Sequence, residues 1–487
     1  MKAIIVSAAT AAIVAGCCSL TCSIPEERDA DGFVSLFNGK DLTGWIGATN
    51  NYGVETCEIE LRNKTKKTIN VLACQPKKAN GVQGGGGNLC TEKEYENFIL
   101  RFEFCMPENG NNGLGIRMTD VDKDAAYYGM CELQLLDDGG SAYYDSAAKK
   151  DKLHPYQYTG SVYGVVPARR DNFNKQIWGK DKNFTGGGSY LRKPGMWNFE
   201  EVRVIGTRIQ VILNGMMITD ADLAQYKGDG TDTPDGRKHP GIQNKKGHIG
   251  WLGHGHNVKW RNIRIKEVPA DYVAADDGVK SRPFGYTQLF DGKTLANWKG
   301  VTTNEKFDNV LVRQAATPEK RAEMQKIANE GMREHWHIRD GALFFDGFQG
   351  GYSLATAKDY KDFDMWVDWR ILSVDGDSGL YLRGSPQVQI WDANNCWGIG
   401  SGGLYNNQKN PSQALSIADN PVGSWNTFHV TMKGEKVTVF LNGVKVVDDT
   451  VLENYWDRKQ PIFPVEQIEL QCHGDPIEFK NIFIKEL

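Results

Sequence analysis

Phe33-Val-Ser-Leu-Phe-Asn-Gly-Lys-Asp-Leu-Thr-Gly-Trp45 returns later in the chain as Tyr286-Thr-Gln-Leu-Phe-Asp-Gly-Lys-Thr-Leu-Ala-Asn-Trp298. The stretch Val258-Lys-Trp-Arg-Asn-Ile-Arg-Ile-Lys-Glu267 likewise returns as Ile477-Glu-Phe-Lys-Asn-Ile-Phe-Ile-Lys-Glu486. A repeat of this length means two copies of one domain. Any chemistry must therefore be sought in both copies and compared.

The repeat predicts the domain organisation. Two all-β domains of roughly 200–250 residues each fit the total length of 487 residues. We expect domain 1 at residues 33–268 and domain 2 at residues 286–487. The segment 269–285 between them is polar and interrupted by Pro and Gly, which is typical of a linker.

The first residues predict export. Lys2 is followed by a short apolar run that ends in Val14-Ala-Gly-Cys17, a pattern like a bacterial lipobox. We expect residues 1–22 to be a lipoprotein signal peptide and the start of a tether, with Cys17 lipidated. The protein would then be anchored to a membrane of the bacterial cell envelope, in the periplasm or on the outer-membrane face. An ordinary signal peptide cut nearby is the alternative.

Composition excludes some classes of function but does not decide whether the cysteines form disulfides. A net charge of −4 gives no basic footprint, so no nucleic-acid partner is expected. Seven cysteines follow residue 22, and none forms a Cys-x-x-Cys pair, which disfavours a zinc site. Five of them lie between residues 57 and 131, where disulfides and buried free thiols are both open.

Both copies contain alternating apolar and polar runs that align with one another. These runs are 98–104 with 363–369, 201–205 with 428–432, and 209–213 with 437–441. Asn214-Gly215 and Asn442-Gly443 close the last pair, and Asn-Gly is a strong hairpin signal because both residues accept positive φ. Many short antiparallel strands predict an all-β fold of two tandem jelly-roll β-sandwiches.

The copies differ in their insertions. Residues 317–331 of copy two predict a surface helix, with Thr317 as N-cap and Pro318 at the first helical position. Copy one instead has long polar loops at 77–88, 168–189 and 225–246. Because such loops often form functional rims, copy one is the better candidate for a shaped pocket.

Polar residues mark one face of two predicted strands in copy one. A strand's period of two places Glu132 and Gln134 on one face and Leu133 on the other. Arg117 opposes its apolar neighbours in the strand before. If the strands are neighbours, Arg117, Glu132 and Gln134 line the floor of a groove in a jelly roll's concave sheet.

These residue types suit a sugar. Arg and Gln give directional hydrogen bonds, Glu can move a proton, and Tyr163 or Trp251 offers a stacking face. The alternative is a cross-strand ion pair between Arg117 and Glu132. The frame is repeated in copy two, which favours function; its members there are Arg383, Gln387, Gln389 and Asp392.

The copies disagree where chemistry matters most. Glu132 corresponds to Gln387, which keeps the shape but cannot act as a base. His254 pairs with His473, so a histidine near a strand end is a proton-transfer candidate in both copies, or equally a structural imidazole. Further histidine candidates without this support are His154 and then His256.

The order of the motifs resembles the 3-keto-disaccharide hydrolase family, also described as 3-keto-glycoside hydrolases or lyases and long catalogued as a domain of unknown function. The matching stretches are Leu36 to Trp45, Asn112 to Arg117, Asp377 to Arg383, Glu132 with Gln134 and Asp137, Gly195 to Asn198, Gly423 to Asn426, and Trp260 to Ile263. The resemblance covers nearly all of both copies.

The resemblance implies a concanavalin A-like jelly roll that acts on glycosides already oxidised at C3. A 3-ketone acidifies the hydrogen on C2, so a base can remove it while the C1 substituent leaves, and water then completes a net hydrolysis. We expect Glu132 or His254 as the base or acid, with Arg117 and Gln134 as donors to substrate and enolate.

Other residues complete the expected site. Asp137 would orient its neighbours, and the remaining expected substrate contacts are Tyr163, His154, Trp251, Arg383, Gln387 and Gln389. No cofactor is required; a divalent metal could bind the Glu, Asp and His present, but their spacing does not demand one.

Two other classes of function compete with an enzyme. One is a non-catalytic, lectin-like carbohydrate-binding surface lipoprotein, since jelly rolls also serve as lectins, and the other is a structural interaction domain. Copy two, with Gln387, fits binding better; copy one, with Glu132 and the long loops, fits catalysis better.

Overall fold

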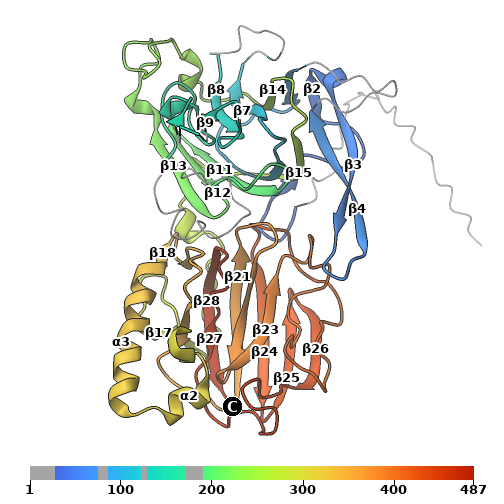
Figure 1. Cartoon of the computed structure of the whole chain (residues 1–487). Coiled ribbons are helices and arrows are strands. Elements are labelled where there is room, and N and C mark those ends of the chain that lie inside the picture. Colours follow the sequence, from blue (N-terminus) through green and yellow to red (C-terminus); the bar gives the residue numbers. More distant parts are fainter. Residues whose placement is uncertain are drawn as a thin grey trace, which may run out of the picture.

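The computed structural model describes residues 28–74, 86–119, 121, 129–145, 147–148, 150–170 and 190–487. The expected signal peptide at 1–22, including Cys17, lies outside the described residues, as does most of the insertions at 77–88 and 168–189. None of the described helices is long and apolar enough to cross a membrane. Domain 1, coloured blue to green, stacks above domain 2, coloured yellow to red (Figure 1).

Domain 1 is a sandwich of an eight-stranded and a five-stranded sheet. The larger sheet has the order β13-β12-β11-β6-β15-β4-β3, with β1 beside β15. In that order the strands span Met216–Asp222, Arg208–Leu213, Trp197–Ile205, Phe98–Cys105, Lys259–Glu267, Lys66–Cys74, Tyr52–Glu60 and Val34–Ser35. The smaller sheet is β2 (Trp45–Gly47), β5 (Gly87–Thr91), β14 (His248–Gly253), β7 (Asn111–Met118) and β8 (Cys131–Leu136).

Domain 2 repeats this architecture strand for strand. Its larger sheet has the order β26-β25-β24-β21-β28-β19-β18, with β16 beside β28. These strands span Val444–Val451, Lys436–Leu441, Asn426–Lys433, Phe363–Ile371, Ile477–Glu486, Ala342–Phe345, Trp336–Arg339 and Thr287–Gln288. The smaller sheet is β17 (Trp298–Thr302), β20 (Tyr352–Thr356), β27 (Glu469–Leu470), β22 (Asp377–Leu382) and β23 (Ser385–Trp391). The predicted all-β fold of two tandem jelly-roll sandwiches is confirmed.

Shorter elements connect the sheets. They are the hairpin of β9 (Tyr144–Asp145) and β10 (Lys150–Asp151), and the 3-10 turns Thr49–Asn51, Pro155–Gln157, Leu223–Gln225, Pro240–Gln243, Ala274–Asp276 and Asn304–Lys306. Among the described residues the α-helices are α2 (Val310–Ala315) and α3 (Pro318–His335), both in domain 2.

Local sequence signals explain the turns and the long helix. Asn214 and Gly215 have φ of 47° and 85°, and Asn442 and Gly443 have 50° and 82°, so both predicted hairpins form. Thr317 caps α3 by accepting a hydrogen bond from the Lys320 backbone N–H at 3.2 Å. The helix runs to His335 rather than to residue 331, and its last turn buries Met332 and His335.

The seven described cysteines are free thiols. Cys74, Cys90 and Cys131 are buried, as expected of a small apolar residue in a sandwich core. Of the two alternatives left open by the sequence, buried thiols rather than disulfides are found among these residues.

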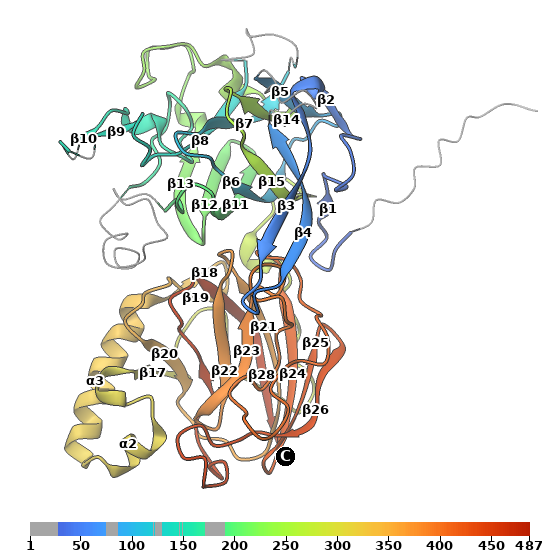
Figure 2. The same cartoon turned by 45° about the vertical axis from the view of Figure 1, so that its right-hand side comes forward.

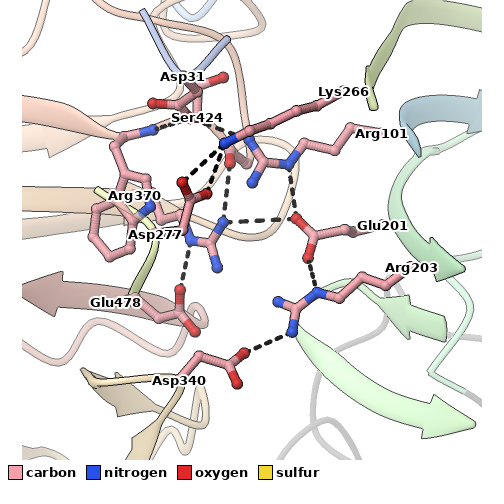
Figure 3. A network of polar contacts seen from close by, with 12 residues as sticks. Asp31, Arg101, Glu201, Arg203, Lys266, Asp277, Asp340, Arg370, Ser424 and Glu478 are labelled. Carbon is pink, nitrogen blue, oxygen red and sulfur yellow. Dashed lines mark hydrogen bonds and ion pairs between the residues drawn. The ribbon is translucent and has the colours of Figure 1, made fainter. Parts of the chain in front are cut away.

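The two domains meet through a buried network of charged side chains (Figure 3). Glu201 on β11 accepts hydrogen bonds from Arg101 Nε and Arg203 Nε, both at 2.7 Å, and lies 3.6 Å from Arg370 Nη1 of domain 2. Arg370 also pairs with Glu478 at 2.5 Å. Arg203 reaches Asp340 in the β18–β19 turn at 2.7 Å. The outward residues of β6 and β11 are therefore covered by domain 2 rather than by solvent.

The segment 269–285 packs into this contact. Asp277 accepts hydrogen bonds from Lys266 at 2.9 Å and from Tyr272 at 3.0 Å, and Lys280 pairs with Asp368 of domain 2 at 2.7 Å. The connection is thus held at both ends by charged contacts.

Candidate functional site

The candidate site is the outer face of the five-stranded sheet of domain 1. Leu133 and Leu135 of β8 are fully buried in the core between the sheets, so Glu132 and Gln134 face outward, as alternation predicts. Gly113 of β7 lies opposite Gln134, and Gly115 lies opposite Glu132. Glu132 and Gln134 therefore each lie beside a glycine of β7, which has no side chain on this face.

Gly113 makes room for the carboxyl group. A Cβ on Gly113 would lie 2.5 Å from Glu132 Oε1 and 3.0 Å from Leu252 Cδ1 of β14. The Glu132 side chain therefore leans over β7 from its own partner Gly115 to Gly113, which is the partner of Gln134. Only a glycine permits this approach.

The surroundings of Glu132 are apolar on one side. Met118 and Met130 sulfurs would lie 2.6 and 2.7 Å from a Cβ on Gly115, and they pack with Cys90 and Leu252 in a small cluster. Burial raises the pKa of Glu132 to about 7. A carboxyl that changes protonation state near neutral pH is suited to general acid–base chemistry.

Amide groups lie next to the carboxyl. Gln134 Nε2 donates to Asn111 Oδ1 at 2.9 Å, which fixes the orientation of both side chains. The second Nε2 hydrogen of Gln134 is not used by this bond, since an amide nitrogen carries two. Gln134 can thus donate to an oxygen of a bound ligand.

Tyr163 stands beside Glu132, in a segment that extends the sheet. The Tyr163 backbone N–H donates to the Glu132 carbonyl at 2.9 Å, and Leu133 is bridged to Val162, so the Tyr163 ring shares the face of Glu132. Its hydroxyl accepts a hydrogen bond from Gln157 Nε2 at 3.3 Å. The ring is edge-on to Tyr156 at 6.4 Å.

His154 continues this aromatic group. Its ring stacks on Tyr156 with centroids 5.3 Å apart and an interplanar angle of 5°. His154, Tyr156 and Tyr163 therefore form one wall, placed along the β8 side of the sheet.

His254 follows the end of β14. It comes two residues after Leu252, whose side chain adjoins the Glu132 carboxyl over Gly113. Burial, and then the neighbouring His256, lower the pKa of His254. His254 therefore lies just past the end of β14 that is nearer to Gly113, the residue over which Glu132 leans.

Arg117 does not join this patch, contrary to the prediction. Its φ of 53° breaks the alternation of β7 and turns the side chain away. Its Nε and Nη2 donate to the Glu96 carbonyl at 3.1 and 2.7 Å, and Nη1 donates to the Asn244 carbonyl at 3.1 Å. Arg383 has the same conformation, with φ of 48° and a bond to the Pro464 carbonyl at 3.1 Å. The repeated arginine therefore fastens loops to the scaffold.

Trp251 and Asp137 are also placed elsewhere. Trp251 is fully buried in the core, where its ring stacks on Trp260 at 4.7 Å, so it offers no face to a sugar. Asp137 is buried after the end of β8 and accepts a hydrogen bond from the Asn109 backbone N–H at 2.8 Å. It holds a turn rather than contacting Gln134.

A buried histidine–aspartate pair lies close to the predicted site without being part of it. His239 Nε2 lies 2.9 Å from Asp235 Oδ2, and a Cβ on Gly164, the residue after Tyr163, would meet both side chains within 2.6 Å. The pair belongs to the predicted insertion 225–246. Its Asp-x-x-x-His spacing was the available signal, but such spacing in a loop does not predict that the two side chains meet.

The two predicted glutamines of copy two form a hydrogen-bonded row with Asp377. Gln387 Nε2 donates to Gln389 Oε1, and Gln389 Nε2 donates to Asp377 Oδ1 at 2.6 Å. Within the described ranges, no three His, Cys, Asp or Glu side chains are grouped so as to hold a metal ion.

Comparison with known proteins identifies the family. The model of the 3-keto-alpha-glucoside-1,2-lyase-like domain matches residues 32–266 and again residues 285–485. A 3-keto-disaccharide hydrolase of Bacteroides thetaiotaomicron is 28% identical over 271 residues, which span 49% of this chain and 79% of the relative.

Two solved structures are also similar. A provisionally assigned glycosyl hydrolase of Parabacteroides distasonis is 26% identical, covering 48% of this chain and 99% of its own, with a TM-score of 0.35. The carbohydrate-binding module CBM66 of Bacillus subtilis is 10% identical, covering 46% and 96%, with a TM-score of 0.21. Because the family model accounts for most of both sandwiches, the chain belongs to the 3-keto-alpha-glucoside-1,2-lyase-like domain family and carries two copies of that domain.

Proposed function

We propose that this protein cleaves glycosides that carry a ketone at C3, and that domain 1 performs the chemistry. The observation that carries the proposal is Glu132, a carboxyl with a pKa of about 7 that leans over Gly113 beside the amide of Gln134. The family match and the 3-keto-disaccharide hydrolase relative support the substrate class.

The reaction begins with removal of the C2 proton. Ionised Glu132 takes this proton, and the C2–H electron pair moves toward the C3 carbonyl to give an enolate. The free Nε2 hydrogen of Gln134 donates to the developing oxyanion, where a positioned donor lowers the barrier. A ketone at C3 makes the C2 proton acidic enough for a carboxylate to remove it. The C2 proton of an unoxidised sugar is not acidic enough for this base.

Departure of the C1 substituent completes the elimination. The enolate electrons form the C1–C2 double bond, the C1–O bond breaks, and the leaving oxygen takes a proton. We assign this proton to His254, because a lowered pKa makes its imidazolium a stronger acid. Addition of water, with OH to C1 and H to C2, then gives net hydrolysis; without that addition the protein acts as a lyase.

The aromatic wall supports the choice of a sugar. Tyr163 shares the face of Glu132, and Tyr156 and His154 extend from it. An amphipathic ring can cover the apolar face of a pyranose while its hydroxyl stays solvated.

A comparison of oxidised and unoxidised substrates tests the proposal. Maltose and cellobiose, with their C3-oxidised forms, are incubated with the full chain and free monosaccharide is quantified. We expect release from at least one oxidised form and none from the parent sugars. Binding of these sugars without turnover would replace the enzyme by the lectin-like alternative.

We also propose that Cys17 carries a lipid and anchors the mature protein in the cell envelope. The support is the Val14-Ala-Gly-Cys17 pattern after a short apolar run. Cells fed an alkyne-tagged fatty acid should label the native protein but not Cys17→Ser. Equal labelling of the two, or none of either, would overturn the anchor.

A further inference from the structure

The two sheet faces have exchanged a carboxylate and an amide. Asn111 lies opposite Leu136 in domain 1, and Asp377 lies opposite Trp391 at the matching position of domain 2. Domain 2 thus has Gln387 where domain 1 has Glu132, but Asp377 where domain 1 has Asn111. Each face therefore keeps one carboxylate: Glu132 on β8 in domain 1, and Asp377 in domain 2 on β22, the counterpart of β7.

Asp377 is at the end of a hydrogen-bonded row. Gln387 donates to Gln389, and Gln389 donates to Asp377 Oδ1 at 2.6 Å. The other carboxylate oxygen lies 3.8 Å from Nδ1 of His473, the counterpart of His254. The Asp377 side chain is 13% exposed and that of His473 is 54% exposed, so the row leads from the buried floor to solvent.

One polar atom on this floor has no partner among the described residues. Gln471 Oε1 is buried without a hydrogen bond, and it lies 3.1 Å from the position that a Cβ on Gly379 would occupy. Gln387 Nε2 lies 3.2 Å from the same point. Leaving a buried amide oxygen without a hydrogen bond is unfavourable, and a ligand hydroxyl that donates to this oxygen would remove that cost.

Aromatic side chains border the row. Val388 is bridged to Leu404, so the next residue, Tyr405, stands beside Gln387 as Tyr163 stands beside Glu132. Tyr405 is 49% exposed and lies edge-on to Trp391 at 5.3 Å. Trp391 in turn stacks on Trp397 at 4.5 Å.

Domain 1 completes the border. The tip of its β3–β4 hairpin reaches domain 2 (Figure 2), where the Arg62 backbone N–H donates to the Cys396 carbonyl at 2.8 Å. The Arg62 guanidinium covers the Trp397 ring at 3.5 Å. The hairpin therefore fixes the loop that holds Trp397.

We propose that this face of domain 2 is a second saccharide-binding site, centred on Asp377, Gln471 and Tyr405 and bordered by the domain 1 hairpin. A carboxylate, an imidazole and an unpaired amide oxygen accept from or donate to sugar hydroxyls, and an exposed tyrosine ring offers a stacking face. The choice of saccharide as ligand class rests on the proposed function, but the site itself does not depend on catalysis in domain 1.

Calorimetric titration of the full chain tests the site. The probes are maltose, cellobiose and their C3-oxidised forms, titrated into Glu132→Gln so that the ligand is not consumed. We expect two sites per chain for at least one probe. Tyr405→Ala and Asp377→Ala, each added to this chain, should weaken one of the two sites by about tenfold or more. Phe284→Ala, which removes a fully exposed ring from the linker, should leave both sites unchanged.

Turnover separates this inference from the proposed function. In the chain with native Glu132, Tyr405→Ala and Asp377→Ala should keep kcat/KM for the oxidised sugar and the native melting temperature. A single site per chain, or two sites that neither substitution affects, would overturn the second site whether or not the protein cleaves the ketone. If either substitution weakens one of two sites as expected but also abolishes turnover, the second site stands and the assignment of chemistry to domain 1 is contradicted.

Discussion

At the scale of single residues, the surroundings of Glu132 determine its chemistry as much as its being a carboxylic acid, where the counterpart Gln387 is an amide. Its carboxyl leans over Gly113 against Leu252, and burial raises its pKa to about 7. In the unfolded chain the same group would titrate near 4.5. The folded protein therefore holds a proton on Glu132 over a pH range in which the unfolded chain has released it.

This difference predicts how Glu132→Gln changes stability with pH. Below pH 4.5 the carboxyl is protonated in both states and contributes nothing. As pH rises toward 7 the unfolded state ionises first, so the native protein loses stability relative to the variant. As the pH is raised from 4 to 8, the free energy of unfolding of the variant should increase by about 2–4 kcal/mol relative to that of the native chain. Denaturant unfolding at both pH values measures the gain.

Glu60→Gln is the matched control. Glu60 is exposed and pairs with Lys64 at the hairpin tip. Its stability difference from the native chain should change little over the same range. An equal pH dependence for the two variants would show that Glu132 is ordinary in the folded state.

Sequence predicts which side of a strand a residue faces only while the strand alternates. Glu132 and Gln134 face outward as the pattern indicates, because β8 is regular. Arg117 turns away because its φ is positive, and an arginine gives no sign of that in the sequence. Its repetition as Arg383 reflects the scaffold, and comparison of two copies cannot separate a shared scaffold from a shared site.

At the scale of elements, strand β7 controls the position of the carboxyl. Gly113 is the residue whose missing Cβ admits Glu132 Oε1. The rest of β7 can pair with β8 and β14 whatever stands at this position. The glycine is therefore required by the site rather than by the sheet.

Gly113→Ala should displace the carboxyl and leave the fold intact. A Cβ would lie 2.5 Å from Glu132 Oε1, closer than atoms can pack, so the side chain must move. We expect kcat for the oxidised sugar to fall about 10²-fold, since misplacement of about 1 Å costs that much. The change is measured by steady-state kinetics, with circular dichroism to verify the sheets.

Gly379→Ala is the control at the matching position of domain 2. Its new Cβ would have contacts no closer than 3.1 Å, and none is with a domain 1 residue. The Gly379→Ala variant should therefore keep the native kcat for the oxidised sugar. Equal losses in the two variants would contradict the assignment of chemistry to domain 1.

Regular elements follow from the sequence, and irregular ones do not. Alternation predicts β6, β12, β21 and β25, and the Asn-Gly pairs predict their turns. Helix α2 carries no periodic signal in its six residues, and residues 159–163 join β8 through isolated bridges rather than a strand. The His239–Asp235 pair depends on how a long loop folds back, which residue spacing does not encode.

At the scale of the whole molecule, the two sandwiches form one unit. Burial alone would raise the pKa of Glu201, but Arg203, Arg101 and Arg370 outweigh it and hold the pKa well below its usual range. The stability contributed by this carboxylate is present above pH 4.5 and is lost as pH falls toward its folded pKa. The repeat predicts two domains, but it does not predict that they are in contact. The charged residues of β6 and β11 have the same alternating pattern as residues that face solvent.

Glu201→Gln should loosen the contact between the domains. The substitution removes the one carboxylate shared by Arg101, Arg203 and Arg370, and breaking a buried ion pair costs about 3–5 kcal/mol. Calorimetry should show a lower and less cooperative unfolding transition. Asp220→Asn, at an exposed pair with Arg208, should cost less than about 1 kcal/mol. Equal effects of the two substitutions would mean that the network does not hold the domains.

The fate of the C2 hydrogen tests the account of Glu132 most directly. The reaction with a C3-oxidised disaccharide is run in D2O, and C2 of the product that carries the C3 ketone is examined by NMR against an enzyme-free control. The account predicts loss of the C2 protium during turnover by the native chain, and loss of turnover by about 10²–10⁴-fold in Glu132→Gln. Product that retains its C2 protium, or a Glu132→Gln variant that turns over at the native rate, would contradict it.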